Sequence, residues 1–447
     1  MGNADALVFF GATGDLAKKQ IYPALAGLTA ANQLDIPVIA VGRSLPGKDA
    51  LRDIIRESLQ SHGAFDATTF DRFFARVVFV GGDYTDADTF RRLKDALGGA
   101  EHPLHYLAIP PSLFGTVVNG LASAGLTHQG RVIVEKPFGR SLATAEELNR
   151  TLHEAFDEDA IFRIDHYLGK EPVQNLLYFR FANTFLEPVW NGRYISRVTV
   201  TMSEAFGVNG RGAFYEEVGA VRDVVQNHLL QIAALVAMEP PCDQKLESLR
   251  EARTAVLEKI SPLAPADVIF GQYRGYLNEP GVAPGSAVET FASVRLHIHT
   301  PRWEGVPFIL RTGKCLDQTM SEVTAEFRDP PANVFGETDD ADENEVTFRL
   351  APEVYTSIQA RAKVPGEQMR GEPIRLIARA SDGHEGHTHG AGVPPYQRLI
   401  GDALEGDRTL FTTERGINAA WRIVDPVVNA GIPVTIYEPG SAGPDRT

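Results

Sequence analysis

The first third of the chain alternates short apolar runs with segments of helical periodicity. The apolar runs lie at residues 6–10, 36–41, 77–80, 105–109 and 132–134. Apolar side chains recur at the three- and four-residue spacing of an amphipathic helix at residues 16–29, 49–60 and 86–97. Short buried strands that alternate with helices are typical of parallel βαβ units. This segment is therefore predicted to form a doubly wound parallel sheet.

Beyond about residue 190 the pattern of polar and apolar positions changes. Alternation of polar and apolar residues, which is typical of antiparallel strands with one solvated face, is the interpretation for residues 194–202, 293–299, 308–311 and 345–350. Residues 214–238 form one long run of helical spacing without proline. We therefore expect two domains, residues 1–168 and residues 169–447, the second being α+β with a large, mostly antiparallel sheet.

Composition narrows the range of partners. The chain has 447 residues, with 43 Lys and Arg against 58 Asp and Glu, which gives a net charge of −15. This charge argues against nucleic acid and anionic membranes as main partners, and a small anionic ligand would need a local cluster of positive charge. No apolar run reaches the ~20 residues of a membrane span. The N-terminus lacks signal-peptide features and there are two cysteines, so we expect a cytoplasmic protein with free thiols.

A glycine-bearing turn follows the first predicted strand. Gly11, Gly14 and Ala17 have the GxxGxxA spacing of a strand–turn–helix phosphate site. Glycine permits the tight turn and a close approach of the backbone to a pyrophosphate, and the start of the helix supplies N–H donors. The motif is short and also fits a plain βα turn. Its position near the start of the chain, between a strand and a helix, favours a dinucleotide.

The end of the second predicted strand bears on the choice between NAD and NADP. An NAD site places an acidic residue there, to accept from the ribose 2′-hydroxyl. Asp35 precedes the strand and so lies at the wrong end, whereas Arg43 follows it. A guanidinium suits a phosphate dianion, so Arg43 is predicted to bind the 2′-phosphate of NADP, the alternative being a solvated surface arginine.

Two later segments concentrate polar side chains. Lys136 follows the strand predicted at 132–134, at the end where such sheets bind ligands, and could meet nicotinamide and substrate together. In RIDHYLGKE, from residue 163, the side chains of His166, Tyr167 and Lys170 are donors suited to a phosphate monoester. A surface lysine remains the alternative for Lys136.

A third candidate segment, RDVVQNHLLQ from residue 222, is helical and mainly apolar. Asp223, Gln226 and Asn227 place polar groups on it, which indicates that the helix borders a cavity. Taken alone, His228 fits a hydrogen-bonded core histidine better than a catalytic base. In the same way, His384, His387 and His389 have the spacing of metal ligands but fit a solvated glycine-rich loop better, and we expect no metal.

Seven stretches together carry a family resemblance over nearly the whole chain. They are GATGDLAKKQIYPAL from residue 11, EKPFG from 135, RIDHYLGKEPVQNL from 163, EAFGVNGRGAFYEEVGAVRDVVQNHLLQ from 204, VPFILRTGK from 306, PYQRLIGDAL from 395 and WRIVDPV from 421. In sequence and in order they resemble the NADP-dependent glucose-6-phosphate dehydrogenases of bacterial type. The resemblance implies a Rossmann-type NADP-binding domain and a second domain for substrate binding and oligomerisation, in a homodimer or homotetramer built through the antiparallel sheet.

The resemblance also implies an activity and a role for each site residue. The activity is oxidation of β-D-glucose 6-phosphate at C1 to 6-phosphoglucono-1,5-lactone, the first step of the pentose phosphate pathway. His228 is implied as the general base and Asp165 as the residue that orients it. Substrate contacts are implied for Lys136, His166, Tyr167, Lys170, Glu204, Asp223 and Lys314. NADP contacts are implied for Gly11, Ala12, Thr13, Gly14, Asp15, Leu16, Ala17, Lys18, Arg43, Asp83, Tyr84, Tyr106 and Lys136.

One departure and two rival interpretations remain. Relatives generally carry a basic residue where this chain has Thr319, which puts one sugar or phosphate contact in question. The first rival is another sugar oxidoreductase of the glucose–fructose oxidoreductase type, which the phosphate-suited donors near residue 166 disfavour. The second is a non-catalytic NADP-binding regulator, which would have no use for the Asp165–His228 pair.

Overall fold

The structure is a computed structural model that describes residues 2–43, 47–243, 245–330, 334–335, 344–366, 369–379 and 392–444. The chain forms two compact units. Unit 1 consists of Met1–Glu171, Pro241–Glu251 and Gly392–Asn418, and unit 2 of Pro172–Pro240, Ala252–Ala391 and Ala419–Thr447. The expected ranges 1–168 and 169–447 are continuous, whereas unit 1 draws in two segments from much later in the chain. Across the described residues, no helix combines the length and apolar character needed to span a membrane.

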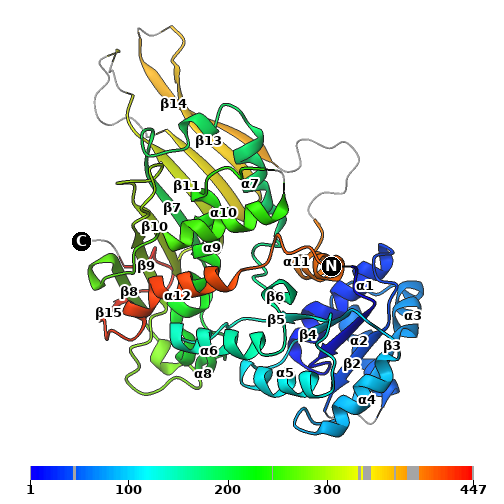
Figure 1. Ribbon diagram of the computed structural model, residues 1–447. Helices are drawn as coiled ribbons and strands as arrows, with labels where there is room; N and C mark the ends of the chain where they lie inside the picture. Colours follow the sequence, from blue (N-terminus) through cyan, green and yellow to red (C-terminus); the bar gives the residue numbers. More distant parts are fainter. Residues whose placement is uncertain are drawn as a thin grey trace. The chain divides into compact units, whose positions relative to one another are not determined.

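Unit 1 contains the predicted parallel sheet, drawn mostly in blue and cyan in Figure 1. Its order is β3-β2-β1-β4-β5-β6, every neighbouring pair is parallel, and the order reverses between β1 and β4. In doubly wound sheets, ligands bind beyond the strand ends at such a switch point. The strands are β1 (Ala6–Phe10), β2 (Val38–Gly42), β3 (Val77–Gly81), β4 (Pro103–Leu107), β5 (Arg131–Val134) and β6 (Ile161–Arg163).

Helices cover both faces of this sheet because successive β1 side chains point to opposite sides. The Phe9 ring lies 5.7 Å from the ring of Tyr22 in the first helix, and the Phe10 ring lies 6.4 Å from that of Phe90 in α4. The helices are α1 (Tyr22–Ala30), which continues a π-helical turn at Ala17–Ile21, then α2 (Lys48–Ser61), α3 (Ala67–Ala75), α4 (Ala87–Leu97), α5 (Phe114–Ser123) and α6 (Leu142–His153).

A late segment completes the core of unit 1. Helix α11 (Pro395–Glu405) packs against α1, and its Leu399 and Ile400 are fully buried in the same cluster as Leu25 and Leu28. Periodicity identifies the buried face of such a helix, but it does not identify the surface that the face covers. This is the physical reason why two continuous ranges leave out part of unit 1.

Unit 2 contains a nine-stranded mixed sheet in the order β14-β13-β12-β11-β7-β10-β9-β8-β15. Most neighbours are antiparallel, as predicted, but β10 runs parallel to β7 and β15 parallel to β8. Over 100 residues separate β7 from β10, which leaves room for the crossover that parallel pairs need. The strands are β7 (Ile195–Ser203), β8 (Val268–Tyr273), β9 (Phe291–Leu296), β10 (Phe308–Gly313), β11 (Met320–Phe327), β12 (Glu345–Ala351), β13 (Tyr355–Lys363), β14 (Gly371–Arg379) and β15 (Val434–Tyr437).

The helical run expected at residues 214–238 is present, but it is not one uninterrupted α-helix. The segment consists of α8 (Gly212–Ala220), a π-helix at Val221–Leu229 and α9 (Leu230–Ala237). Gly219 breaks the helix with a φ of 61° and a ψ of −178°, and a Cβ at this position would overlap the carboxylate of Glu289. The remaining described helices of substantial length are α7 (Glu171–Ala182), α10 (Leu246–Glu258) and α12 (Glu414–Val428).

Candidate active site

The glycine turn after β1 forms a cradle that side chains would fill. Gly11 has a φ of 89°, and a Cβ there would overlap the backbone oxygen of Ala108. The Gly14 N–H donates to the Gly11 carbonyl at 2.9 Å, which closes the turn. Ala17 then begins the π-helical turn with a fully buried side chain. A bulkier chain at Gly11 would displace the backbone, so the turn suits the close approach of a dinucleotide pyrophosphate.

Arg43 and Tyr84 lie beside this turn. The Tyr84 hydroxyl accepts from the Gly11 N–H at 3.0 Å, and burial raises the pKa of this phenol, which keeps it neutral. The guanidinium of Arg43 sits 5.5 Å from the centroid of the Tyr84 ring and 3.7 Å from an Asp83 oxygen. Because the Arg43 side chain is 54% exposed, its charge can meet a ligand from solvent. Asp35 pairs instead with Arg76.

Tyr106 is not exposed to a ligand but contacts a neighbouring carboxylate. Its side chain is fully buried, and its hydroxyl donates to Glu135 at 2.6 Å. Burial raises the pKa of Glu135 to about 7, against the opposing effects of the Tyr106 hydrogen bond and the Lys136 charge. Lys136 follows Glu135 directly beyond β5, at the strand end where the sequence predicts a ligand-facing lysine.

The side chains between Asp165 and Lys170 gather into one cluster beyond β6. Asp165 is 3% exposed and accepts from the Tyr167 backbone N–H at 3.0 Å. The His166 ring lies 5.0 Å from the Tyr167 ring, and Lys170 Nζ lies 3.4 Å from the centroid of Tyr167. Burial lowers the pKa of Lys170 to about 8, opposed by the Asp165 charge, so Lys170 stays mostly protonated at pH 7. The cluster offers the donors that a phosphate monoester needs.

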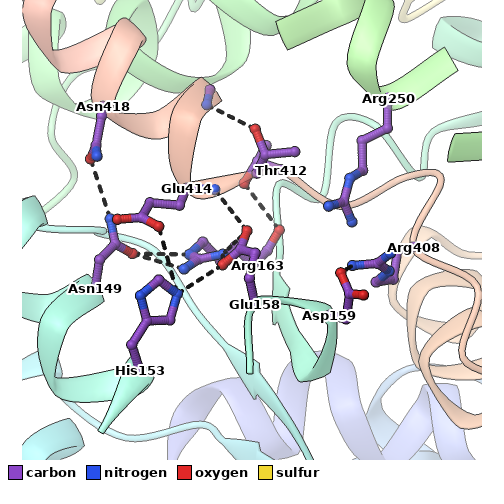
Figure 2. Close-up of polar contacts among 12 residues, drawn as sticks. Asn149, His153, Glu158, Asp159, Arg163, Arg250, Arg408, Thr412, Glu414 and Asn418 are labelled. Carbon is purple, nitrogen blue, oxygen red and sulfur yellow. Dashed lines mark hydrogen bonds and ion pairs between the residues drawn. The ribbon is translucent and has the colours of Figure 1, made fainter. Parts of the chain in front are cut away.

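A buried ionic network fixes the strand from which this cluster begins. Figure 2 shows Arg163, the last residue of β6, which is 1% exposed and donates to both Glu158 oxygens at 2.8 and 2.9 Å. Its backbone oxygen accepts from the Thr412 N–H at 3.2 Å, which ties the strand to the segment before α12. An Arg–carboxylate pair of this kind is both strong and directional.

The same network contains a group with the composition of a metal site. Ligand atoms of His153, Glu158 and Glu414 lie within 4.8 Å of one another. However, Glu158 also accepts from Arg163 and from the Glu414 backbone N–H. The Arg163 guanidinium therefore already balances the negative charge of Glu158. Physically, the group is an ion-pair network. The candidate ligands His384, His387 and His389 lie outside the described residues.

In unit 2, Glu204 and Lys314 form an ion pair. They follow β7 and β10, and because these strands are parallel neighbours their carboxyl ends share one edge of the sheet. Lys314 is 5% exposed and lies 5.2 Å from the centroid of the Tyr215 ring. The hydroxyl of Thr319 accepts from the Ala205 N–H at 2.9 Å, so this residue stabilises the turn after Glu204.

Asp223 and His228 lie on the π-helix of unit 2. Glu289 accepts from the Val221 N–H at 3.0 Å and so caps the start of this helix. Burial raises the pKa of Glu289. His228 is 3% exposed, and its backbone N–H donates to the Asn227 side chain at 2.5 Å. Short π-helical segments often occur at functional sites because they redirect side chains.

The structure thus places the predicted residues in four local groups. Unit 1 holds the glycine turn with Arg43, Asp83 and Tyr84, and the group from Lys136 to Lys170. Unit 2 holds the Glu204–Lys314 pair and the π-helix. Sequence analysis missed the supporting residues Glu135, Arg163, Glu289 and Tyr396. Three of them stand inside or next to the quoted motifs, but nothing in a sequence shows which buried carboxylate meets which donor.

Comparison with known proteins matches both parts of the chain to one family. A profile described as "Glucose-6-phosphate dehydrogenase, NAD binding domain" matches residues 8–175, and one described as "Glucose-6-phosphate dehydrogenase, C-terminal domain" matches residues 177–447. The protein named glucose-6-phosphate 1-dehydrogenase 1 of Mycobacterium tuberculosis is 40% identical over 445 residues, which are 99% of this chain and 94% of that protein.

Two solved structures share the whole fold. The crystal structure of glucose-6-phosphate 1-dehydrogenase from Mycobacterium avium is 41% identical, with a TM-score of 0.91 over 99% of this chain and 96% of that one. A structure of glucose-6-phosphate dehydrogenase in complex with its substrate glucose-6-phosphate is 34% identical, with a TM-score of 0.91 over 100% of this chain and 97% of that one.

Proposed function

The chain belongs to the glucose-6-phosphate dehydrogenase family, and we propose that it oxidises β-D-glucose 6-phosphate at C1 with NADP. The product is 6-phosphoglucono-1,5-lactone, and the reaction is the first step of the pentose phosphate pathway. One observation carries the choice of substrate: the side chains of His166, Tyr167 and Lys170, each able to donate to a phosphate, lie together beyond β6. This cluster favours a phosphorylated sugar over the free sugar of a glucose–fructose oxidoreductase.

The proposed chemistry assigns a proton transfer to His228. A neutral imidazole is a suitable base near pH 7, and here it takes the proton from the C1 hydroxyl. Asp165 orients the ring and stabilises the imidazolium that forms. As the C1–O bond becomes a carbonyl, the C1 hydrogen leaves with its electron pair. Bound NADP supplies the acceptor for this hydride, so the reaction requires no further redox partner.

Substrate binding draws on the two ends of the sugar. His166, Tyr167 and Lys170 bind the 6-phosphate through charge-assisted hydrogen bonds. Glu204 and Asp223 accept from sugar hydroxyls, and Lys314, which Glu204 holds in place, donates to the sugar. Lys136 lies between substrate and cofactor.

NADP specificity follows from the environment of Arg43. Its guanidinium is exposed, stands over the Tyr84 ring and follows β2, the strand that neighbours β1. Gly11, Ala12, Thr13, Gly14, Asp15, Leu16, Ala17 and Lys18 line the pyrophosphate turn. Asp83 keeps Arg43 oriented, Tyr84 supports the turn by accepting from the Gly11 N–H, and Tyr106 acts through Glu135.

Two properties complete the proposal. The enzyme acts in the cytoplasm, where Cys242 and Cys315, both free thiols in the structure, would stay reduced. It assembles as a homodimer or homotetramer, with unit 2 providing the contact.

Absorbance at the NADPH band tests the proposal. Purified protein is given NADP or NAD with glucose 6-phosphate, glucose or 6-phosphogluconate. We expect rapid reduction with glucose 6-phosphate alone, at a higher kcat/KM for NADP than for NAD. Equal rates with free glucose would support the glucose–fructose oxidoreductase alternative, and no reduction with any sugar would support a non-catalytic regulator.

A further inference from the structure

A buried carboxylate in unit 1 joins the end of β5 to helix α11. Glu135 is 7% exposed and accepts hydrogen bonds from the hydroxyls of Tyr106, at 2.6 Å, and Tyr396. Removing a carboxylate from water is costly unless donors compensate it, and two phenols with the adjacent Lys136 charge offset part of that cost. The Tyr396 side chain, itself 9% exposed, is therefore held by its hydroxyl.

The ring of Tyr396 lies next to the cluster of His166, Tyr167 and Lys170, which is the proposed phosphate site. Its ring stacks on that of His166, with 6.2 Å between centroids and an interplanar angle of 12°. His166 in turn lies 5.0 Å from Tyr167, and Lys170 stands 3.4 Å over the Tyr167 ring. Tyr396, His166, Tyr167 and Lys170 thus form one row of contacts, and Glu135 anchors the end of this row that lies away from Lys170.

We propose that Tyr396 and Glu135 are positioning residues of the phosphate subsite, which hold His166 in the orientation that binds the 6-phosphate of the sugar. This inference rests on the proposed function, because it takes the cluster to be the phosphate site. Tyr396 stacks on His166, and Glu135 acts on this phosphate subsite through Tyr396.

The physical basis is preorganisation. His166 lies in the loop after β6, where an imidazole can occupy several rotamers, and choosing one of them on binding costs free energy. The Tyr396 ring, which stacks on His166 and is fixed by its hydrogen bond to Glu135, holds His166 in one rotamer before the substrate binds. A free sugar has no phosphate for His166 to bind, so its turnover gains nothing from the arrangement.

The experiment compares four variants on two substrates. Tyr396→Phe keeps the ring but removes the hydroxyl, and Tyr396→Leu removes the stack as well. Glu135→Gln removes the charge, and the double variant Tyr396→Phe with Glu135→Gln measures their coupling. Tyr276→Phe is the matched control, because the fully buried Tyr276 also donates to a carboxylate, that of Glu216, at 2.6 Å, but belongs to unit 2 and to no predicted site.

We expect the KM for glucose 6-phosphate to rise roughly 3- to 10-fold in Tyr396→Phe and further in Tyr396→Leu. A hydrogen bond to a charged group is worth roughly 10- to 150-fold, and only part of that reaches the substrate because Tyr396 acts through His166. The kcat with glucose 6-phosphate and the kcat/KM with free glucose stay near wild type. Calorimetry without NADP shows the same loss of affinity for glucose 6-phosphate. In the Glu135→Gln background, Tyr396→Phe raises the KM for glucose 6-phosphate little further. Tyr276→Phe leaves the kinetic constants for both sugars unchanged.

Other results would overturn the inference. If Tyr396→Phe lowers activity on both sugars equally, or changes neither, Tyr396 only packs α11 against the sheet. Additive effects of Glu135→Gln and Tyr396→Phe would remove Glu135 from the chain of contacts. Tyr396→Phe preserves volume, so it decides the matter even where Tyr396→Leu does not fold. Failure of the wild type to use glucose 6-phosphate would instead contradict the proposed function, which separates the two claims.

Discussion

Residues that titrate near neutrality stand where the proposed chemistry needs them. Burial lowers the pKa of Lys170 to about 8 and raises that of Glu135 to about 7. The ammonium of Lys170 is charged below its pKa and neutral above it. It is therefore able to bind a phosphate at pH 7 and loses this ability as the solution becomes alkaline.

This titration gives a pH dependence with a definite sign. The kcat/KM for glucose 6-phosphate, which reports the free enzyme, is expected to fall above about pH 8. In Lys170→Arg the guanidinium stays charged, so the alkaline fall at that pH disappears even if the absolute value is lower. Steady-state profiles of both proteins test this, with free glucose as the control substrate. An unchanged profile in Lys170→Arg would assign the fall to another group.

His228 is the residue whose loss should affect turnover most. Asparagine keeps a polar side chain of similar size but cannot act as a base at neutral pH. We expect His228→Asn to lower kcat by about 10²–10⁴, with little change in the dissociation constant for glucose 6-phosphate. Stopped-flow turnover and calorimetric binding measure the two quantities. Wild-type turnover in this variant would exclude His228 as the base.

Arg43 should discriminate between the two cofactors. A charge-assisted hydrogen bond is worth about 1.5–3 kcal/mol, or roughly 10- to 150-fold in affinity. Arg43→Ala is therefore expected to weaken NADP by that factor and NAD far less, because NAD has no 2′-phosphate. Fluorescence titration with each reduced cofactor provides the comparison. Equal weakening of both would indicate a general defect of the glycine turn.

At the scale of elements, the break at Gly219 sets the course of the π-helix that carries Asp223 and His228. The Val221 N–H is capped by Glu289, and the carbonyl of Glu289 accepts from the Ala220 N–H at 3.0 Å. The helical run at 214–238 is visible in the sequence, but its interruption depends on a carboxylate some 70 residues later. Sequence periodicity alone therefore overestimates the length of the helix.

Gly219→Ala tests this account. Alanine at a φ of 61°, with its Cβ against the Glu289 carboxylate, should lower the free energy of unfolding by about 1–3 kcal/mol and reduce kcat as the π-helix shifts. Gly285→Ala is the matched control, because Gly285 has a φ of 73° with nothing within 4 Å of its Cβ. Denaturant unfolding of both variants gives the comparison, and equal losses would show that backbone strain alone matters.

Strand prediction succeeded where the pattern of polarity is local. Strands β1 to β5 of unit 1 follow from short apolar runs, whereas β6 was not predicted, and β7 and β12 follow from alternation. The parallel direction of β10 could not be predicted, because alternation fixes which face a strand buries but not the direction of its neighbour. For the same reason, the sequence does not show that Glu204 and Lys314 lie at the same edge of the sheet.

At the scale of the whole molecule, neither the net charge nor the order of residues along the chain indicates where the candidate phosphate sites lie. The net charge of −15 disfavours anionic polymers, yet Arg43 and Lys170 lie in local environments suited to phosphate. Tyr396 reaches the row with His166 only because Gly392–Asn418 folds into unit 1. Motif matching marks candidate site residues along the sequence, whereas the contacts that support them required the fold.

The central claim is that a hydride leaves C1 of glucose 6-phosphate for NADP. Incubation with glucose 6-phosphate deuterated at C1, followed by mass spectrometry of the reduced cofactor, measures this transfer directly. We predict NADPH heavier by one mass unit, with full retention of the label and 6-phosphogluconate as the hydrolysed product. Unlabelled NADPH, or label that remains in the sugar product, would contradict the account.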